Sequence, residues 1–297
     1  MAADELALHD PINEASTVAG PLYMLVADGE VKAVRGRPPS IEWFERSALT
    51  VRADEAFWVH LGSFAGRERY AAVQIGKPGA AEATAFRPAR QSGFLSLFQL
   101  ARASPVESQL ALCAVHMGAW LHRSGYCGSC GHEAAYITEL NKRVCTNAGG
   151  CGHATYPRIE PAIVALVIAG TRCLLARQAS FPKAYYAPIA GFVEAGETPE
   201  RAVSREVFEE IGQVVQTTTY IAAQPWPYPS SLMLGFIAHV APDQPIHLSG
   251  EIEDAIWVDL ATVSQAIEEP GSVPLLLPPP GVIGRMLIEH WLALKQS

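Results

Sequence analysis

The chain has 297 residues, 49% of them apolar, and a formal net charge of −8, so it is long and apolar enough for two or three packed units and is not a disordered chain. The negative charge disfavours broad nonspecific binding to nucleic acid, which depends on clustered lysine and arginine. No apolar run approaches the roughly 20 residues of a membrane helix, and the acidic start lacks the features of a signal peptide. We therefore expect a cytoplasmic protein with no membrane contact.

The pattern of residues 1–122 predicts a small β-rich or α+β domain that ends in a helix. Asp28-Gly29 tolerates the positive φ of a tight turn and predicts a β-hairpin. The helix is expected over 104–123, because Ser104 can cap it, Glu107 completes a capping box and an apolar stripe follows. Strands are expected at 22–26, 31–34, 56–61 and 69–75.

Residues 123–156 hold four clustered cysteines. Cys127 and Cys130 have two residues between them, whereas Cys145 and Cys151 have five. Two short thiolate pairs about fifteen residues apart can converge on one tetrahedral Zn²⁺ ion, as in a zinc ribbon. The expected role is structural, because four thiolates leave no open coordination position. The alternatives are a vacant site or one in which a histidine of the two Cys-Gly-His strings replaces a thiolate.

From residue 157 to 297 the pattern becomes α/β, and its central feature is a helix expected over 198–211. Thr198 can cap this helix. Glu206, Glu209 and Glu210 stand at positions i, i+3 and i+4, so their carboxylates share one face. Carboxylates that repel one another suit a site for Mg²⁺ or Mn²⁺, although a solvated acidic face is the usual explanation of such a string. Further strands are expected at 162–168, 172–176, 232–240 and 255–258, and a closing helix at 282–294.

The three glutamates belong to a longer pattern, which we call the glutamate motif. Residues 191–213 fit GX5EX7REUXEEXGU at seven fixed letters, for which chance matching is on the order of 10⁻⁶. The chain therefore resembles the Nudix hydrolase superfamily. Gln213 departs from the pattern, which asks for an aliphatic residue, and we expect only a packing adjustment there. The fixed letters are Gly191, Glu197, Arg205, Glu206, Glu209, Glu210 and Gly212.

This resemblance implies that residues 157–297 form an α/β/α sandwich with a mixed sheet. The fold class of the whole chain is then α+β with α/β, because the small β-rich domain and the zinc ribbon precede the sandwich. The resemblance also implies two or three divalent ions that polarise a diphosphate. Arg205 is then expected to pair with the carboxylates of the motif and to orient them.

A second string narrows the substrate. Residues 224–231, QPWPYPSS, place three prolines around two aromatic residues and form a rigid wall on which a flat ring can stack. A proline-rich loop that packs on its own domain is the alternative for this string by itself. Together with the glutamate motif and the cysteines, it resembles the SQPWPFPxS array of the NADH pyrophosphatase family. Ala223 and Tyr228 depart from that array.

The family resemblance covers most of residues 120–297 and implies site residues position by position. The metal ligands fall on Glu206, Glu209, Glu210, Glu251 and the main-chain carbonyl of Gly284. The base-binding pocket falls on Tyr156, Phe192, Gln224, Trp226, Ser231 and Met233. For Met233, a place in the core of its strand is an equally good explanation.

The expected reaction is metal-assisted hydrolysis of the pyrophosphate bond of NAD(H) to NMN(H) and AMP by a homodimer, with Glu251 or a motif glutamate as the base. Three alternatives stay open: removal of an NAD cap from RNA, a broader ADP-ribose or dinucleotide hydrolase, and a non-catalytic nucleotide sensor. The intact glutamates argue against the sensor.

Overall fold

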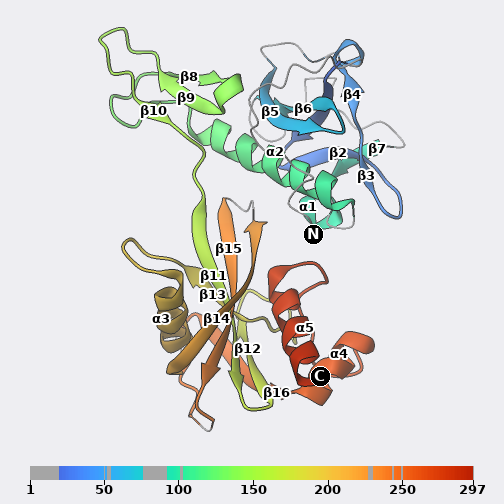
Figure 1. The fold of residues 1–297 in the computed structure, drawn as a ribbon, viewed down its shortest axis with the longest axis vertical. Coiled ribbons are helices and arrows are strands. Elements are labelled where there is room, and N and C mark those ends of the chain that lie inside the picture. The colour runs from blue at the N-terminus through green and yellow to red at the C-terminus, as the bar shows by residue number, and fades with distance from the viewer. Residues whose placement is uncertain are drawn as a thin grey trace. The chain divides into compact units, whose positions relative to one another are not determined.

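The computed structural model describes residues 20–49, 51, 55–75, 92–100, 103–226, 230–242, 244–248 and 250–296. These residues divide into two compact units with separate cores (Figure 1). The first unit lies within Met1–Arg158 and Pro227–Ser230, and the second lies within Ile159–Trp226 and Ser231–Ser297. Within the described ranges, no helix has both the length and the apolar character needed to cross a lipid bilayer.

A mixed sheet forms the first part of the first unit. Its strands are β1 (Leu22–Ala27), β2 (Glu30–Val34), β3 (Ser40–Ile41), β4 (Phe44–Glu45), β5 (Ala56–Phe64), β6 (Arg67–Gln74) and β7 (Ser92–Leu95). The order is β3-β2-β1-β6-β5, with β4 on β1, β7 on β2, and β1 parallel to β6. The predicted hairpin is confirmed, since Asp28 and Gly29 have φ values of 52° and 77° between β1 and β2.

The helix α2 (Pro105–Arg123) packs on this sheet and follows the short α1 (Leu97–Leu100). It begins as predicted, because the Ser104 hydroxyl accepts a hydrogen bond from the Glu107 amide at 3.2 Å. Leu110, Ala114, Met117 and Leu121 of the predicted stripe are buried in the core between helix and sheet.

Three short strands form a second sheet in the first unit: β8 (Ala134–Ile137), β9 (Lys142–Cys145) and β10 (Ala154–Thr155). Asn141, in the turn between β8 and β9, donates its side-chain amide to the carbonyl of His60 in β5 at 3.0 Å. The buried Arg143 donates to the carbonyls of Leu121 and Ala134. The bonds to His60 and Leu121 fasten the small sheet to the rest of its own unit. The domain boundary expected at residue 123 stays a prediction.

The second unit is an α/β/α sandwich around a mixed sheet. Its elements are β11 (Glu160–Ala169), β12 (Arg172–Gln178), β13 (Ile189–Phe192), α3 (Pro199–Ile211), β14 (Val215–Trp226), β15 (Ser231–Val240), β16 (Ile252–Asp259), α4 (Leu260–Glu268) and α5 (Ile283–Gln296). The strand order is β14-β15-β11-β12-β16 with β13 on β11, and only the β11–β15 pair is parallel among these described strands.

The two faces of this sheet pack against different helices. In β11, Ile163, Ala165 and Val167 join the core under α3. The alternating residues Val164, Leu166 and Ile168 join the core under α4 and α5. Because successive side chains of a strand point to opposite faces, α3 covers one face and α4 with α5 the other. The mixed sheet between helices agrees with the sandwich that the sequence predicted.

Three elements of the second unit were not predicted: β13, β14 and α4. Of the QPWPYPSS string, Gln224–Trp226 belong to the end of β14, whereas residues 227–229 lie outside the described residues. β14 is an edge strand, which is where a proline such as Pro225 is tolerated in a sheet. The helix α4 has only 9 residues, but it has a clear cap, since Asp259 accepts from the Thr262 amide at 2.8 Å.

Candidate active site

Helix α3 carries the glutamates of the motif and begins and ends where the sequence predicts. The Thr198 hydroxyl accepts a hydrogen bond from the Arg201 amide at 3.4 Å, and Gly212 ends the helix in the left-handed conformation with φ 70°. The apolar side of the helix packs on the sheet through Ala202, Val203, Val207 and Ile211. The motif therefore lies on a rigid helix that is fixed to the core.

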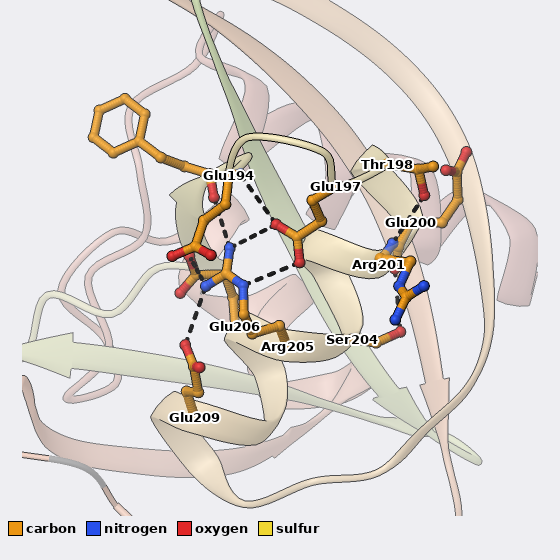
Figure 2. Close-up of polar contacts among 10 residues, drawn as sticks. Glu194, Glu197, Thr198, Glu200, Arg201, Ser204, Arg205, Glu206 and Glu209 are labelled. Carbon is orange, nitrogen blue, oxygen red and sulfur yellow. Dashed lines mark hydrogen bonds and ion pairs between the residues drawn. The ribbon is translucent and has the colours of Figure 1, made fainter.

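Arg205 connects three carboxylates of the motif (Figure 2). Its Nη1 lies 2.8 Å from Glu206 Oε1 and 3.1 Å from Glu209 Oε2, while Nε and Nη2 lie 3.0 and 2.9 Å from the Glu197 oxygens. Nη2 also donates to the Phe192 carbonyl at 2.8 Å. The Glu197 carboxylate raises the pKa of Arg205, and Arg205 in turn lowers the pKa of Glu197. The planar guanidinium thus holds these carboxylates in one arrangement.

Gly191, the first letter of the motif, makes room for one of these carboxylates. A Cβ atom at this position would lie 2.0 Å from Cδ of Glu206. Gly191 is in β13 and faces the α3 side of the sheet, because it pairs with Ile163 in β11. A side chain here would displace Glu206, so the glycine is required by space rather than by its backbone angles.

A cavity of about 640 Å³ lies beside α3. It is bordered by Gln178, Ala190, Gly191, Phe192, Glu194, Arg205, Glu206, Glu209, Glu210, Gly250 and Glu251. The structure therefore brings Glu251, which is far away in the sequence, to the three glutamates of α3. Gln178, Glu194 and Gly250 were not predicted, and no pattern in the sequence distinguishes them.

Glu210 is the most buried of these carboxylates, with only 6% of its surface exposed. Burial raises its pKa to about 8, and repulsion by Glu206, Glu251 and Glu209 adds to the shift. A carboxylate in such surroundings requires either a proton or a neighbouring cation. Carboxylate oxygens around one cavity are the ligands that Mg²⁺ and Mn²⁺ prefer, so these residues fit a divalent ion.

Five of the six predicted base-binding residues share the other face of the sheet. Phe192 pairs with Ala162, Ala162 with Met233, and Met233 with Gln224, so these four side chains point to the same side. Trp226 pairs with Ser231 two residues further along and therefore points to that side too. Met233 borders the core under α5, which identifies the face. Tyr156 belongs to the first unit, where it is 60% exposed.

Gln224 uses its amide to hold the start of α5. Its Nε2 donates to the Gly281 carbonyl at 2.8 Å, and its Oε1 accepts from the Ile283 amide at 2.8 Å. Gly284 follows in the first turn of α5, where a Cβ would lie 3.3 Å from Pro188. Gly284 therefore lies on the side of the sheet that carries Phe192 and Trp226, and it does not border the carboxylate cavity.

The four predicted zinc ligands converge in the first unit. The Sγ atoms of Cys127 and Cys151 are 3.9 Å apart, those of Cys130 and Cys145 are 3.4 Å apart, and all four lie within 4.8 Å of one another. A tetrahedral thiolate site with bonds of about 2.3 Å has sulfur–sulfur edges of about 3.8 Å. The wide second pair therefore closes the cluster, which is compatible with a zinc ribbon. Among the described residues, this close group contains no histidine.

Known proteins match the chain. The profile described as NUDIX domain matches residues 158–276. The NAD-capped RNA hydrolase NudC of Pseudomonas aeruginosa is 33% identical over 260 residues, which cover 86% of this chain and 83% of that protein. The mitochondrial NAD(P)H pyrophosphatase NUDT13 of Mus musculus is 38% identical over 66% of this chain and 57% of its own length. The NAD-capped RNA hydrolase NUDT12 of Pongo abelii is 38% identical over 60% of this chain. The match spans only 40% of the length of that relative.

Adding a methyl group at Gly191 tests whether this glycine makes room for Glu206. We expect Gly191→Ala to weaken Mn²⁺ binding about tenfold or more, because a displaced ligand costs 10- to 100-fold in affinity. Gly250→Ala is the matched control, since a Cβ at that cavity position meets nothing within 4 Å. Isothermal titration with Mn²⁺ measures both. Equal affinities in the two variants would contradict the steric role.

The buried Glu210 predicts how the stability of the protein in EDTA depends on pH. Its folded-state pKa of about 8 exceeds the ordinary 4.5, so the folded state binds the proton more tightly than the unfolded state does. The free energy of unfolding should therefore fall as the pH rises from about 4.5 to about 8.

Glu210→Gln removes this titration and should stabilise the protein at pH 8 by roughly 2 to 5 kcal/mol, with no gain near pH 4.5. Denaturant unfolding at several pH values measures the difference. Glu200→Gln, at an exposed position of the same helix, should leave the pH dependence unchanged. If the free energy of unfolding of Glu210→Gln falls with pH as steeply as that of the wild type, Glu210 is not the group that causes the dependence.

Proposed function

Because the chain belongs to the NADH pyrophosphatase family of the Nudix hydrolase superfamily, we propose that it hydrolyses the pyrophosphate bond of NAD(H) to NMN(H) and AMP. One observation carries this proposal. Gly191 and Phe192 are consecutive in β13 and face opposite sides of the sheet, the first toward Glu206 and the second toward the row of Met233 and Gln224. A dinucleotide has a charged diphosphate joined to flat rings. The carboxylates near Gly191 would bind the diphosphate through metal ions, and the ring of Phe192 would stack on a base.

The charged centre of the substrate would occupy the carboxylate cavity. Glu206, Glu209, Glu210 and Glu251 would hold Mg²⁺ or Mn²⁺, whereas the carbonyl of Gly284, the further ligand expected from the family resemblance, does not border this cavity. The bound ions would neutralise the diphosphate and make a water molecule acidic enough to attack phosphorus. Arg205 keeps Glu206 and Glu209 in position, and a carboxylate oxygen of Glu251 or of the motif accepts the proton of the attacking water.

The flat rings of the substrate would bind on the α5 face. Phe192 is 55% exposed and has a free ring to stack on a base. Trp226 and Ser231 lie at the same end of that face, with Ser231 suited to a hydroxyl or phosphate oxygen. The Gln224 amide already binds residues 281 and 283, so we assign it the role of holding the pocket wall. Met233 completes the proposed pocket on this face, and Tyr156, in the first unit, stays an expectation from the family resemblance.

Removal of an NAD cap from RNA is the second candidate, and it breaks the same bond. The relatives from Pseudomonas aeruginosa and Pongo abelii, both named NAD-capped RNA hydrolases, favour it. The net charge of −8 gives no added affinity for a polynucleotide.

Product analysis with purified protein tests the proposed reaction. With Mg²⁺ or Mn²⁺ present, we expect NADH to give AMP and NMNH, and Glu209→Gln to lower kcat at least about 100-fold, because it removes charge from the metal site. Glu200→Gln is the matched control on an exposed part of the same helix. Parallel reactions with NAD⁺, ADP-ribose and NAD-capped RNA rank the substrates. If the folded, metal-loaded protein cleaves none of them, the hydrolase proposal fails and a nucleotide sensor becomes the better account.

We further propose that the four cysteines bind one structural Zn²⁺, which is supported by their mutual distances within 4.8 Å. Two hydrogen bonds, from Asn141 to His60 in β5 and from Arg143 to Leu121 in α2, join this segment to the neighbouring strand and helix, so the ion would stabilise the first unit. The homodimer and the cytoplasmic location are proposals that rest on the family resemblance and the sequence.

Cys145→Ser is expected to abolish the stoichiometric zinc and to lower the melting temperature by several degrees, because the segment has too few apolar residues to fold without an ion. Metal analysis and calorimetry measure the two effects. Cys113→Ser, in α2 and outside the cluster, should retain the zinc. Full zinc content in Cys145→Ser would rule out the four-thiolate site.

A further inference from the structure

Gln213, the departure from the glutamate motif, is completely buried. Its exposed fraction is 0%, and its Nε2 donates to the carbonyl of Pro245 at 2.8 Å. Its Oε1 has no hydrogen-bond partner among the described residues. Burying an amide with one group unsatisfied destabilises the folded state, whereas an aliphatic side chain would bear no such cost. The bond to Pro245 is therefore the feature that this glutamine adds.

This bond joins the two segments that supply the carboxylates. Gln213 directly follows Gly212, which ends the helix of Glu206, Glu209 and Glu210. Pro245 lies in the connection from β15 to β16 that ends at Glu251. The described residues of that connection form neither helix nor strand. Glu251 is thus carried by an irregular segment, unlike Glu206, Glu209 and Glu210, which lie on α3.

Two further hydrogen bonds run between the same segments. The His247 amide donates to the Ile211 carbonyl at 3.1 Å, and the Val214 amide donates to Gln244 Oε1 at 3.2 Å. Gln213 is the member of this set whose side chain is enclosed, so water cannot replace its bond to Pro245 at low cost.

Repulsion between the like charges around the cavity acts on the connection that carries Glu251. Glu251 borders the same cavity as Glu206, Glu209 and Glu210, and Arg205 holds Glu197, Glu206 and Glu209 but makes no hydrogen bond to Glu251 among the described residues. Repulsion therefore favours withdrawal of Glu251, and an irregular segment can withdraw more easily than a helix. A bond from the end of α3 to this segment opposes that movement.

We propose that Gln213 is a positioning residue that holds Glu251 opposite the glutamates of α3, so that all four can bind the same divalent ions. The inference rests on the proposed hydrolase function for its meaning in catalysis. The bond itself, and its effect on ion binding, do not depend on which substrate the protein cleaves.

Replacing the amide with a thioether of similar size tests the proposal. In Gln213→Met we expect hydrogen exchange at the amides of His247 and Val214, which bond across the two segments, to speed up about tenfold or more in protein kept in EDTA. Mn²⁺ affinity should fall about 10-fold, within the range for loss of a partner that orients a metal ligand. kcat for NADH should fall by at least as much, with a smaller change in KM. Gln216→Met makes the same chemical change at an exposed position of β14 and should alter none of these quantities.

Gln213→Leu restores the aliphatic residue that the motif asks for and guards against a folding defect specific to methionine. It should show the same faster exchange and weaker Mn²⁺ binding in a folded protein. Wild-type exchange and wild-type Mn²⁺ affinity in both variants would overturn the proposal. A wild-type protein that fails to cleave NADH while both variants show the expected exchange and affinity would instead refute the proposed substrate and leave the role of Gln213 intact.

Discussion

The active-site region of this protein depends on holding five like-charged glutamates around one cavity. Arg205 offsets part of their repulsion, since one guanidinium binds Glu206 and Glu209 of this group together with Glu197 and a backbone carbonyl. The rest of the local sequence serves the same end. Gly191 leaves the space that Glu206 occupies, and Gly212 turns the chain out of α3 just before the bond from Gln213 to the segment of Glu251. These contacts form an arrangement that the addition of cations would stabilise.

The second constraint is the alternation of side chains in a β-strand. Because Gly191 and Phe192 are adjacent, β13 contributes to the carboxylate cavity on one face of the sheet. On the other face it contributes Phe192 to the row that contains Met233 and Gln224. The edge strand β14 extends that row, and the Gln224 amide fixes the start of α5 beside it. A substrate with a charged centre and flat ends would thus meet a different surface at each part. The sandwich architecture itself, with helices on both faces, provides the two surfaces.

Local signals made much of this predictable. Thr198, Pro199 and Gly212 marked the ends of α3, and the spacing of Glu206, Glu209 and Glu210 placed them together. The cysteine pairs predicted their own convergence, although the five-residue gap between Cys145 and Cys151 left it open. The role of Gly191 was not predictable, because it depends on a contact with a side chain fifteen residues later.

Other features escaped the sequence because tertiary contacts decide them. β13 is only four residues long and is defined by its pairing with β11. Gln224 was expected to bind a base, yet its partners lie 57 and 59 residues further along the chain. At Gln213 the sequence predicted only a packing adjustment, and the structure adds a hydrogen bond to a residue 32 positions away. The same applies to Gln178 and Gly250, which reach the cavity through the fold of β12 and β16.

The most direct measurement is anomalous diffraction from crystals of the protein grown with Mn²⁺ and a dinucleotide whose bridging oxygen is replaced by a methylene group. The account predicts manganese peaks in the cavity, within bonding distance of oxygens of Glu206, Glu209, Glu210 and Glu251, with the diphosphate analogue bridging them and a base against Phe192. Manganese bound elsewhere, or a dinucleotide ordered away from these carboxylates, would contradict it.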